Sequence, residues 1–393
     1  MPKKHSSVPK LYNPYSYHRP HLIRWRGSVI PKVLPSTIVV TLVSVIVCIV
    51  NLEAKIKLSI PSTFIPVLGF VVGLLLTYRT NTAYDRYWEG RRLWSTMVVA
   101  IRNLTRNIWV NVKENDGTSD LVEKITAINL LLGFAVATKH YLREEDGILY
   151  EDLKPLISNI KSDLPGFEPL EEQNSSSEVN HNLPLEITLY LSSYIDNKRQ
   201  NNKADVPTTN SMYGALNTLI DCLTQFERIL RSPIPLAYSI HLSQTVWIYC
   251  LSLPFQLVDG LKYITIPIVF LATFILMGIL QIGGEIENPF GYDENDLDLD
   301  GFCDTIKHEL NTITARQKPK VDDWVYNSDN HPFGKEEITA SEARKLSIDE
   351  VRTLLTKEGE RTSIENNNNF REVIIEEKDE NENENLDVTV KMN

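Results

Sequence analysis

This chain of 393 residues lacks the cysteine patterns that build disulfide-rich domains or hold zinc. Its four cysteines are scattered and form no CxxC pair, which excludes a disulfide framework and a thiolate zinc site. Two of them, Cys48 and Cys250, lie in apolar runs, where cysteine usually behaves as a small hydrophobic residue. A cleavable signal peptide is not expected either, because the chain begins with a long polar segment and the apolar part of a leader would come sooner.

Motifs for enzyme chemistry are also lacking. The sequence has no glycine-rich phosphate loop, no HExxH, no GxSxG and no cluster of histidine and cysteine. His241 is the one histidine inside a predicted membrane span, and a lone histidine there is more often a hydrogen-bonded packing residue than a catalyst. We therefore predict that the protein is not an enzyme, and we assign no catalytic residue.

Acidic residues outnumber basic ones, 51 to 40, although the beginning of the chain is basic. The formal net charge is −11, and much of it comes from the acidic stretch EEKDENENENLD near the end. Phosphate contacts need clustered cations, so this balance argues against a nucleic-acid partner. The tail (340–393) is acidic, rich in asparagine and poor in aromatic residues. It cannot bury enough surface to offset its ordering entropy, so we expect it to be disordered.

What the sequence does contain is four long apolar stretches, at 33–52, about 60–78, 235–258 and 263–284. Each has roughly the twenty residues that a helix needs to cross the hydrocarbon core. The first, second and fourth contain no Asp, Glu, Lys or Arg, whereas the alternative, a soluble domain with four buried helices, rarely has such long uncharged stretches. The third carries His241, Ser243 and Gln244, so we expect it to face other helices or an aqueous cavity.

Basic residues orient these spans. The N-terminal segment is basic and arginines follow the second span, so the positive-inside rule places both termini and the long central region in the cytosol of a plasma or internal membrane. We predict an all-α, multi-pass integral membrane protein with four transmembrane helices per protomer. Its expected segments are a basic N-terminal segment (1–32), transmembrane helices 1 and 2 (33–78), a cytosolic helical region (79–232) with a flexible insertion at about 163–208, transmembrane helices 3 and 4 (233–284), a cytosolic segment packing on the helical region (285–339) and the acidic tail (340–393).

The stretch RTNTAYDRYWEGRRLW (79–94) follows the apolar FVVGLLLTY directly, with no proline or glycine at the junction. One helix could therefore run through residues 60–94, on the order of 50 Å at 1.5 Å per residue. Its first half would lie in lipid or against neighbouring helices, and its second half would project into the cytosol. In that second half we expect the large aromatic residues to pack on other cytosolic helices; these are Tyr84, Tyr87, Trp88 and Trp94.

Most of the arginines in this stretch are expected to make salt bridges within the protein. Glu89 lies three residues from both Arg86 and Arg92, so it can pair with either on one helix face. Arg79 is the exception, because it sits at the membrane boundary. We expect Arg79 to contact an anion or a lipid headgroup.

The apolar half of this helix has a pattern of its own. Gly69 and Gly73 form a GxxxG spacing, which lets helices approach closely in membranes. Around them an apolar stripe follows helical spacing: Val67, Phe70, Val71 and Leu74. If several copies surround an axis, this stripe forms a constriction that can gate a pore by dewetting. From spacing alone, an ordinary lipid-facing or packing surface is the favoured interpretation.

Four motifs, spread over residues 24–303, together resemble the bestrophin family in its bacterial and fungal branch. They are RWRGSVIPKVLP before the first span, GFVVGLLLTYRTNTAYDRYWEGRRLW after the first hairpin, IPLAYSIHLSQTVWIYCLSLPFQLVDG in the third span and GGEIENPFGYDENDLDLDGFC after the fourth. The resemblance implies a homopentameric channel for chloride or other monovalent anions, embedded in membrane lipid. It also implies that five copies of the second span line a central pore. The apolar neck of that pore would fall on the stripe at Val67, Phe70, Val71 and Leu74.

The same resemblance raises the question of calcium. In animal members of the family, the stretch that matches EIENPFGYDENDLDLD forms a calcium clasp, and here Asn288, Asp293 and Asp296 could supply oxygen ligands. The acidic run is thinner in this chain, and Glu285 stands where the animal proteins have an amide. The alternative is a turn, in which Asn-Pro ends one helix and the acids cap the next. We expect no required cofactor, with calcium as a second possibility.

Two other functions stay open at the level of sequence. A membrane-anchored transporter would usually show broken helices and paired repeats, of which Pro66 and Pro267 give only a hint. A scaffold without channel activity could bind partners through the acidic tail.

Overall fold

The computed structural model describes residues 25, 27–61, 63–115, 117–145, 147, 150–160, 182–333 and 338–356. The chain forms two compact units, residues 1–315 and residues 316–393. Most of the predicted basic segment 1–32, the first part of the predicted insertion 163–208 and the end of the tail lie outside the described residues.

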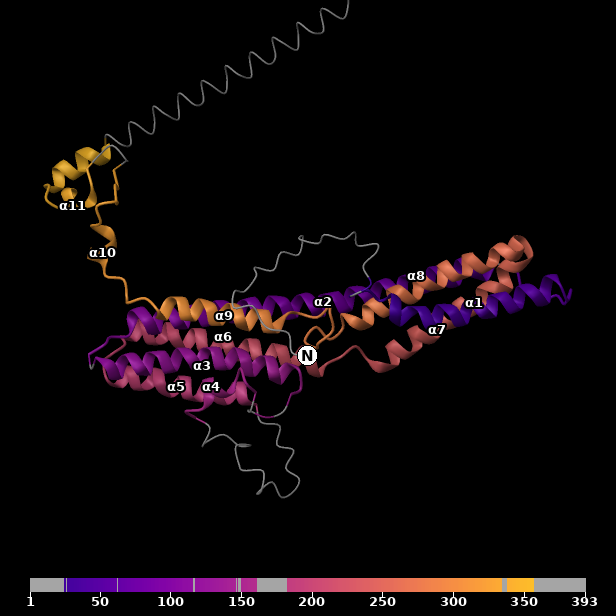
Figure 1. Ribbon diagram of the computed structural model, residues 1–393, viewed down its shortest axis with the longest axis horizontal. Helices are drawn as coiled ribbons and strands as arrows, with labels where there is room; N and C mark the ends of the chain where they lie inside the picture. The colour runs from indigo at the N-terminus through magenta and orange to yellow at the C-terminus, as the bar shows by residue number, and fades with distance from the viewer. Residues whose placement is uncertain are drawn as a thin grey trace, which may run out of the picture. The chain divides into compact units, whose positions relative to one another are not determined.

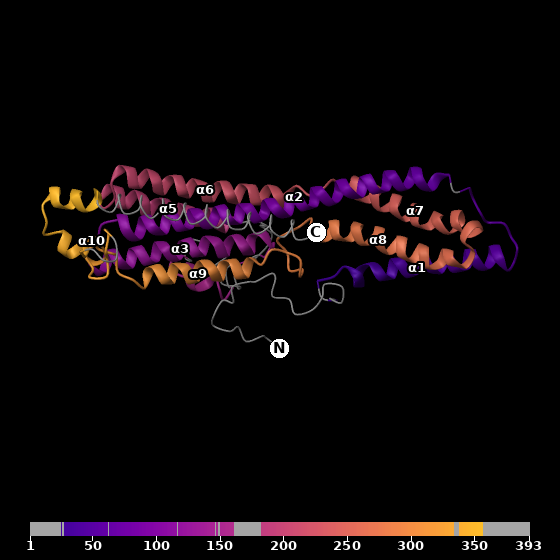
Figure 2. The same ribbon diagram turned by 90° about the horizontal axis from the view of Figure 1, so that it is seen from above.

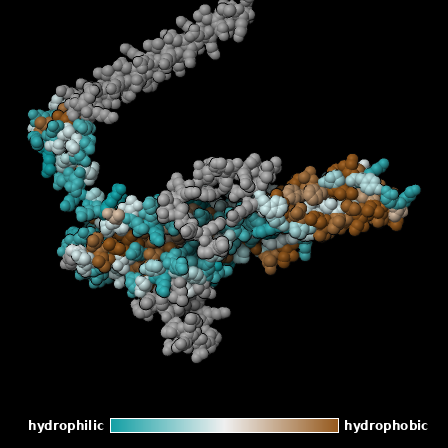
Figure 3. Space-filling model, viewed as in Figure 1, coloured by the Kyte–Doolittle hydropathy of each residue, from teal (hydrophilic) through white to brown (hydrophobic). Residues whose placement is uncertain are grey.

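One end of the first unit is an apolar bundle. It contains α1 (Ile30–Leu52), α7 (Leu236–Leu261), the short η4 (Lys262–Ile264), α8 (Thr265–Glu285) and the first half of α2 (Phe64–Arg106) (Figure 1). Its buried core includes Val40, Val72, Val246, Cys250 and Val269. Apolar side chains also cover the outside of this end, where Figure 3 shows hydrophobic residues gathered. Three of these helices match the predicted stretches 33–52, 235–258 and 263–284 to within a few residues at each end, whereas α2 begins near the predicted start of its stretch and runs far beyond residue 78.

Three described stretches are long and apolar enough to cross a membrane: α1, α3 (Thr118–Leu142) and the 50 residues of α7 and α8 together. Of the most apolar window of α3, 67% is buried inside the protein, so its apolar surface faces other helices and not lipid. Asp120 and Lys124 are buried in it as well, which suits a protein core with ion pairs better than a lipid contact. The described part of α2 does not meet the same criterion, so the number of four crossings stays a prediction.

The predicted continuous rod is confirmed. α2 is a single helix of 43 residues, Phe64–Arg106, and the π-helical η2 (Asn107–Asn111) extends it (Figure 2). At 1.5 Å per residue α2 is about 65 Å long. It packs against α7 and α8 with its first half and against α6 (Val206–Arg231) with its second, so it joins the two ends of the unit.

The other end of the first unit is a second helical bundle. It is made of the second half of α2 together with α3, α5 (Leu183–Gln200), α6, α9 (Leu299–Thr314) and the short α4 (Lys154–Ile157). Trp94 is fully buried in its core, with its ring 5.9 Å from that of Phe226 and 5.8 Å from that of Phe302. The predicted packing is therefore confirmed for Trp94. Tyr87 also packs, partly buried, against this core, whereas Tyr84 and Trp88 are more than half exposed in this chain and their packing stays a prediction.

The helix α5 corrects the predicted insertion. Residues 163–208 were expected to be flexible, yet residues 183–200 form a regular helix. Asn182 caps it by accepting a hydrogen bond from the Leu185 amide, and Pro184 follows within the first turn. Ile187, Leu191 and Ile195 then recur at four-residue spacing and are buried in the core of the bundle.

The segment after α8 begins as predicted and ends differently. Asp298 caps α9 by accepting from the Gly301 amide, and α9 packs on α3 and α2, as expected for the start of segment 285–339. The second unit contains α10 (Val321–Val325) and α11 (Ala340–Ala343), with a capping box between Thr339 and Glu342. Residues 348–356 are helical too, so the prediction that disorder begins at residue 340 is wrong for the first part of the tail.

Candidate functional site: the exposed face of α2

The predicted stripe lies on the surface of the protomer. Val67 and Phe70 are 63% and 74% exposed, and Val71 and Leu74 are exposed beside them. Val72 belongs to the same turns of the helix but points the other way: it is 1% exposed and packs into the apolar core. The helix therefore presents a wide apolar face that no other described part of this chain covers.

This exposed face continues along the whole of α2. Steps of three and four residues keep side chains on one side of a helix, and such steps lead from Leu74 through Tyr78 and Asp85 to Arg92, all of them exposed. This exposed surface is apolar before residue 78 and carries charged side chains after it. Arg92 lies 18 residues after Leu74, about 27 Å further along the helix. A solute that moved along this face would pass from an apolar segment to a charged one.

The two glycines of the predicted GxxxG spacing have different surroundings. A Cβ atom at Gly69 would lie 2.9 Å from the hydroxyl oxygen of Tyr249, so this glycine permits a close approach of α2 and α7. A Cβ atom at Gly73 would meet no atom within 4 Å. Within this protomer the predicted packing role is therefore met by Gly69 and not by Gly73, which lies on the exposed face.

Arg79 has a partner inside the chain. Its side chain is largely buried against Gly283 of α8, and its Nη2 atom lies 3.5 Å from a carboxylate oxygen of Glu287. Glu287 also accepts a 3.0 Å hydrogen bond from the Ile234 amide just before α7. The expected contact of Arg79 with an anion or headgroup stays a prediction, and its observed role is to tie α2 to the loop after α8.

Arg86 fastens the same loop to the second bundle. Its guanidinium donates to the carbonyl oxygens of Glu287 at 3.0 Å, Ser232 at 2.5 Å and Ile229 at 2.5 Å. Removal from water lowers the pKa of this arginine, and the carboxylate of Glu287 opposes that shift. Glu89 pairs with Arg228 of α6, so the pairing predicted with Arg86 or Arg92 is wrong.

Two of the candidate calcium ligands accept hydrogen bonds from nearby backbone amides. Asn288 accepts a hydrogen bond from the amide of Phe290 through its side-chain oxygen, and Asp296 accepts one from the amide of Asp293 at 2.7 Å. Both are therefore bonded within the predicted turn. Among the described residues no group of three or more His, Cys, Asp or Glu side chains is placed to hold a metal ion. Burial, together with the nearby carboxylates, raises the pKa of Asp296 to about 6.

A lysine that the sequence did not single out lies among these acids. Lys32, in the first turn of α1, places its ammonium 3.0 Å from Glu285 and 3.6 Å from Asp293. The second oxygen of Glu285 accepts a 2.8 Å hydrogen bond from Asn295. Lys32 therefore brings a positive charge from the start of the first apolar helix to the acidic loop that follows the last one. Only the fold brings these positions together, because more than 250 residues separate them.

Comparisons with known proteins fit this architecture. The profile of a family described as Bacterial/Fungal Bestrophin protein matches residues 12–312. A voltage-dependent anion channel-forming protein of Synechocystis sp. is 42% identical over 294 residues, covering 74% of this chain and 90% of that protein. One of the same name from Escherichia coli strain K12 is 28% identical over 309 residues, covering 76% of this chain and 92% of that protein.

Solved structures of bacterial bestrophin homologues have a similar fold. A crystal structure of a point mutant of a bacterial bestrophin homologue from Klebsiella pneumoniae superposes with a TM-score of 0.62 at 27% identity, covering 74% of this chain and 100% of that one. The fold and the sequence thus define a helical membrane protein of the bestrophin class. This chain belongs to the bacterial and fungal bestrophin family.

Proposed function

We propose that the protein is a bestrophin-like anion channel that conducts chloride or other monovalent anions passively. In this proposal five copies assemble around an axis, each contributes α2, and both termini of every copy lie in the cytosol. The observation that carries it is the uncovered face of α2, which is apolar along one half and charged along the other. The names of the relatives in Synechocystis and Escherichia coli support the same conclusion.

The neck of the pore is formed by the stripe at Val67, Phe70, Val71 and Leu74. An apolar constriction of this kind opens and closes by wetting and dewetting. Anions that are weakly hydrated give up their water more readily than small cations, so they cross such a segment at a lower cost. Beyond the neck the same face carries Asp85 and then Arg92, and in this proposal the arginine supplies the positive charge that attracts anions from the cytosol.

Conduction requires no metal in this proposal. The ammonium of Lys32 lies 3.6 Å from Asp293, one of the acids that calcium would bind. Calcium binding at Asn288, Asp293 and Asp296 would therefore compete with Lys32 for Asp293. Currents recorded with micromolar calcium and with a chelator should therefore be equal, and a current that disappears with the chelator would restore the calcium alternative.

Reconstitution in planar bilayers tests the function itself. The full chain, purified and inserted under a chloride gradient, should give single-channel steps that reverse near the chloride potential. Silence across voltage, calcium and pH would favour the alternative of a membrane-anchored transporter or scaffold. Native mass measurement of the detergent-solubilised protein should give five copies, and a stable monomer would contradict the assembly on which the pore depends.

The neck residues are tested by shortening one side chain of the stripe. Val71→Ala widens the apolar constriction, so the ratio of permeabilities for large and small anions should change by about twofold or more. Val72→Ala is the matched control, since the same atoms are removed one residue away from a buried position. Unchanged conductance and selectivity in Val71→Ala would show that this side chain does not border the ion path.

A further inference from the structure

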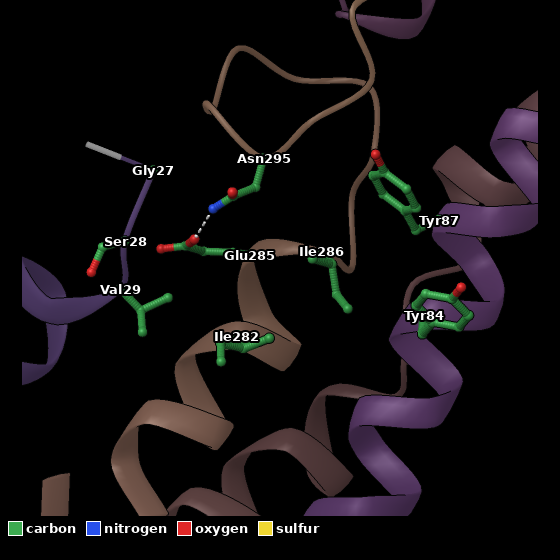
Figure 4. Close-up of a pocket in the computed structure, with 9 residues that line it drawn as sticks. All are labelled: Gly27, Ser28, Val29, Tyr84, Tyr87, Ile282, Glu285, Ile286 and Asn295. Carbon is green, nitrogen blue, oxygen red and sulfur yellow. Dashed lines mark hydrogen bonds between the residues drawn. The ribbon is translucent and has the colours of Figure 1, made fainter. Parts of the chain in front are cut away.

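A pocket of about 450 Å³ lies where α1 begins and α8 ends. Its wall combines residues just before α1, two tyrosines of α2 and the end of α8 with the loop after it; among them are Ser28, Val29, Tyr84, Tyr87, Glu285 and Asn295 (Figure 4). None of these residues belongs to the exposed apolar stripe. The pocket is therefore distinct from the proposed neck of the pore.

The position of the pocket is the first clue to its occupant. α1 leads away from the pocket and α8 leads up to it, and both helices are apolar. Their outer side chains, such as Val39 and Leu271, are about half exposed. On the other side of the pocket lies the polar loop that carries Asn295. The pocket thus sits at the boundary between the apolar surface and the polar one, which is the level of lipid headgroups.

The electrostatics of the wall favour a cation. The side chain of Glu285 is 5% exposed, yet its carboxylate borders the pocket next to Ser28 and Asn295 (Figure 4). Each carboxylate oxygen has two lone pairs, so Glu285 can accept another donor besides Lys32 and Asn295. Asp293 lies close by and leaves the cluster with more negative than positive charge.

The start of α1 offers no free amide to a ligand. The Ile30 amide donates to the Ser28 hydroxyl, the Lys32 and Val33 amides donate to the Val29 carbonyl oxygen, and residue 31 is a proline. Ile282 and Ile286 add apolar surface beside the charged groups. A ligand that suits this wall has an ammonium and an apolar body.

We propose that this pocket binds the phosphoethanolamine headgroup of a membrane phospholipid, with the ammonium on Glu285. A primary ammonium donates three hydrogen bonds, whereas a choline headgroup has no N–H to donate. A glycerol headgroup carries no cation and gains nothing from the carboxylate. The lipid joins α1, α2 and α8 at the membrane boundary, and it acts as a structural ligand of the channel.

The test is a lipid titration of the full chain in detergent, followed by native mass spectrometry. The probes are phosphatidylethanolamine, phosphatidylcholine, phosphatidylglycerol and free phosphoethanolamine. Loss of one charge-assisted hydrogen bond corresponds to about tenfold in affinity, so phosphatidylethanolamine should bind about tenfold more tightly than the other two lipids. The free headgroup should bind more weakly than the lipid, because it lacks the apolar body.

Two variants and one control locate the binding. Glu285→Gln keeps the size of the side chain and should weaken phosphatidylethanolamine binding about tenfold. Ile282→Trp fills the pocket while keeping the carboxylate, and it should remove the preference among lipids. Glu53→Gln, which alters a carboxylate at the other end of α1, should change nothing. Circular dichroism verifies that each variant is helical.

Any of three results would overturn the proposal. One is equal binding of phosphatidylethanolamine and phosphatidylglycerol, and another is unchanged binding after Glu285→Gln or Ile282→Trp in a folded protein. The third is binding of free phosphoethanolamine without binding of the lipid, which would assign the pocket to a soluble ligand. None of these results bears on chloride currents, so the channel proposal stands or falls separately.

Discussion

The two halves of α2 share one helix and one exposed face, but they are held in place by different forces. The first half packs on α7 and α8 through apolar side chains such as Val72 and Leu76, with Gly69 allowing the helices to come close. The second half is held by directed bonds, above all those of Arg86 to three carbonyl oxygens. In the apolar half the exposed side chains carry the proposed function, and in the polar half the partly buried arginines position the helix.

The difference is physical in origin. Apolar packing has no strong directional preference, so the first half can move against its neighbours at modest cost. Hydrogen bonds from a half-buried guanidinium fix a geometry, and leaving their acceptors unpaired is expensive. Apolar packing therefore suits a neck that opens and closes. Hydrogen bonds from a half-buried guanidinium suit a contact that holds the helix in one position.

The largest expected effect is a loss of stability when Arg86 is replaced. Arg86→Ala leaves the carbonyls of Ile229, Ser232 and Glu287 without their donor, and it should lower the free energy of unfolding by about 3 kcal/mol. Arg92→Ala is the matched control, because Arg92 is exposed, and its effect should stay within about 0.5 kcal/mol. Thermal unfolding in detergent measures both. Equal melting temperatures for the two variants would show that Arg86 does not anchor the helix.

The two glycines sharpen the comparison within the apolar half. Gly69→Ala places a methyl group against the Tyr249 hydroxyl and should destabilise the protein by about 1 kcal/mol, after the gain in helix propensity is subtracted. Gly73→Ala meets nothing in the protomer and should stabilise the helix by up to about 1 kcal/mol. The melting temperatures should therefore move in opposite directions. A loss of the pentamer in Gly73→Ala would instead show that Gly73 packs against another protomer.

A smaller effect is expected in the loop that both halves support. The folded-state pKa of Asp296 is about 6, above its usual value, so the folded protein binds a proton more tightly than the unfolded chain. Stability from this group is therefore present below pH 4 and is lost as the pH rises to 6. Asp296→Asn should be more stable than the parent by about 1 kcal/mol at pH 8, allowing for solvent screening.

The measurement is a series of thermal unfolding curves between pH 4 and pH 8. The advantage of Asp296→Asn should vanish near pH 4, because the parent side chain is then protonated as well. Asp293→Asn is a useful comparison, since it removes a partner of Lys32 and should not stabilise the protein. An advantage of Asp296→Asn that is the same at every pH would contradict the assigned titration.

The sequence predicted the apolar half of the molecule better than the polar half. Uncharged runs of about twenty residues identify membrane helices because lipid constrains composition directly, and the uninterrupted junction at 79–94 predicted the continuous α2. The amphipathic spacing of α5 was also present in the sequence. We assigned those residues to an insertion because polar, low-complexity stretches flank them on both sides.

The contacts that build the polar site could not be predicted in the same way. Arg86 binds backbone carbonyls, which every residue has, so no partner side chain signals the bond. Lys32 and Glu285 lie at opposite ends of the membrane region in sequence, and only the packing of α1 on α8 makes them neighbours. Arg228 likewise competes successfully with Arg86 and Arg92 for Glu89, because helix packing brings it close.

The most direct test of the central claim is thiol labelling of the stripe during conduction. The native cysteines are all buried, so a new cysteine at position 71 is the one expected to react from water. In planar bilayers, a charged thiol reagent should alter the chloride current of Val71→Cys within seconds and leave Val72→Cys unchanged. If Val71→Cys is fully modified, as shown by mass measurement, and its current does not change, then the exposed face of α2 does not border the path of the anion.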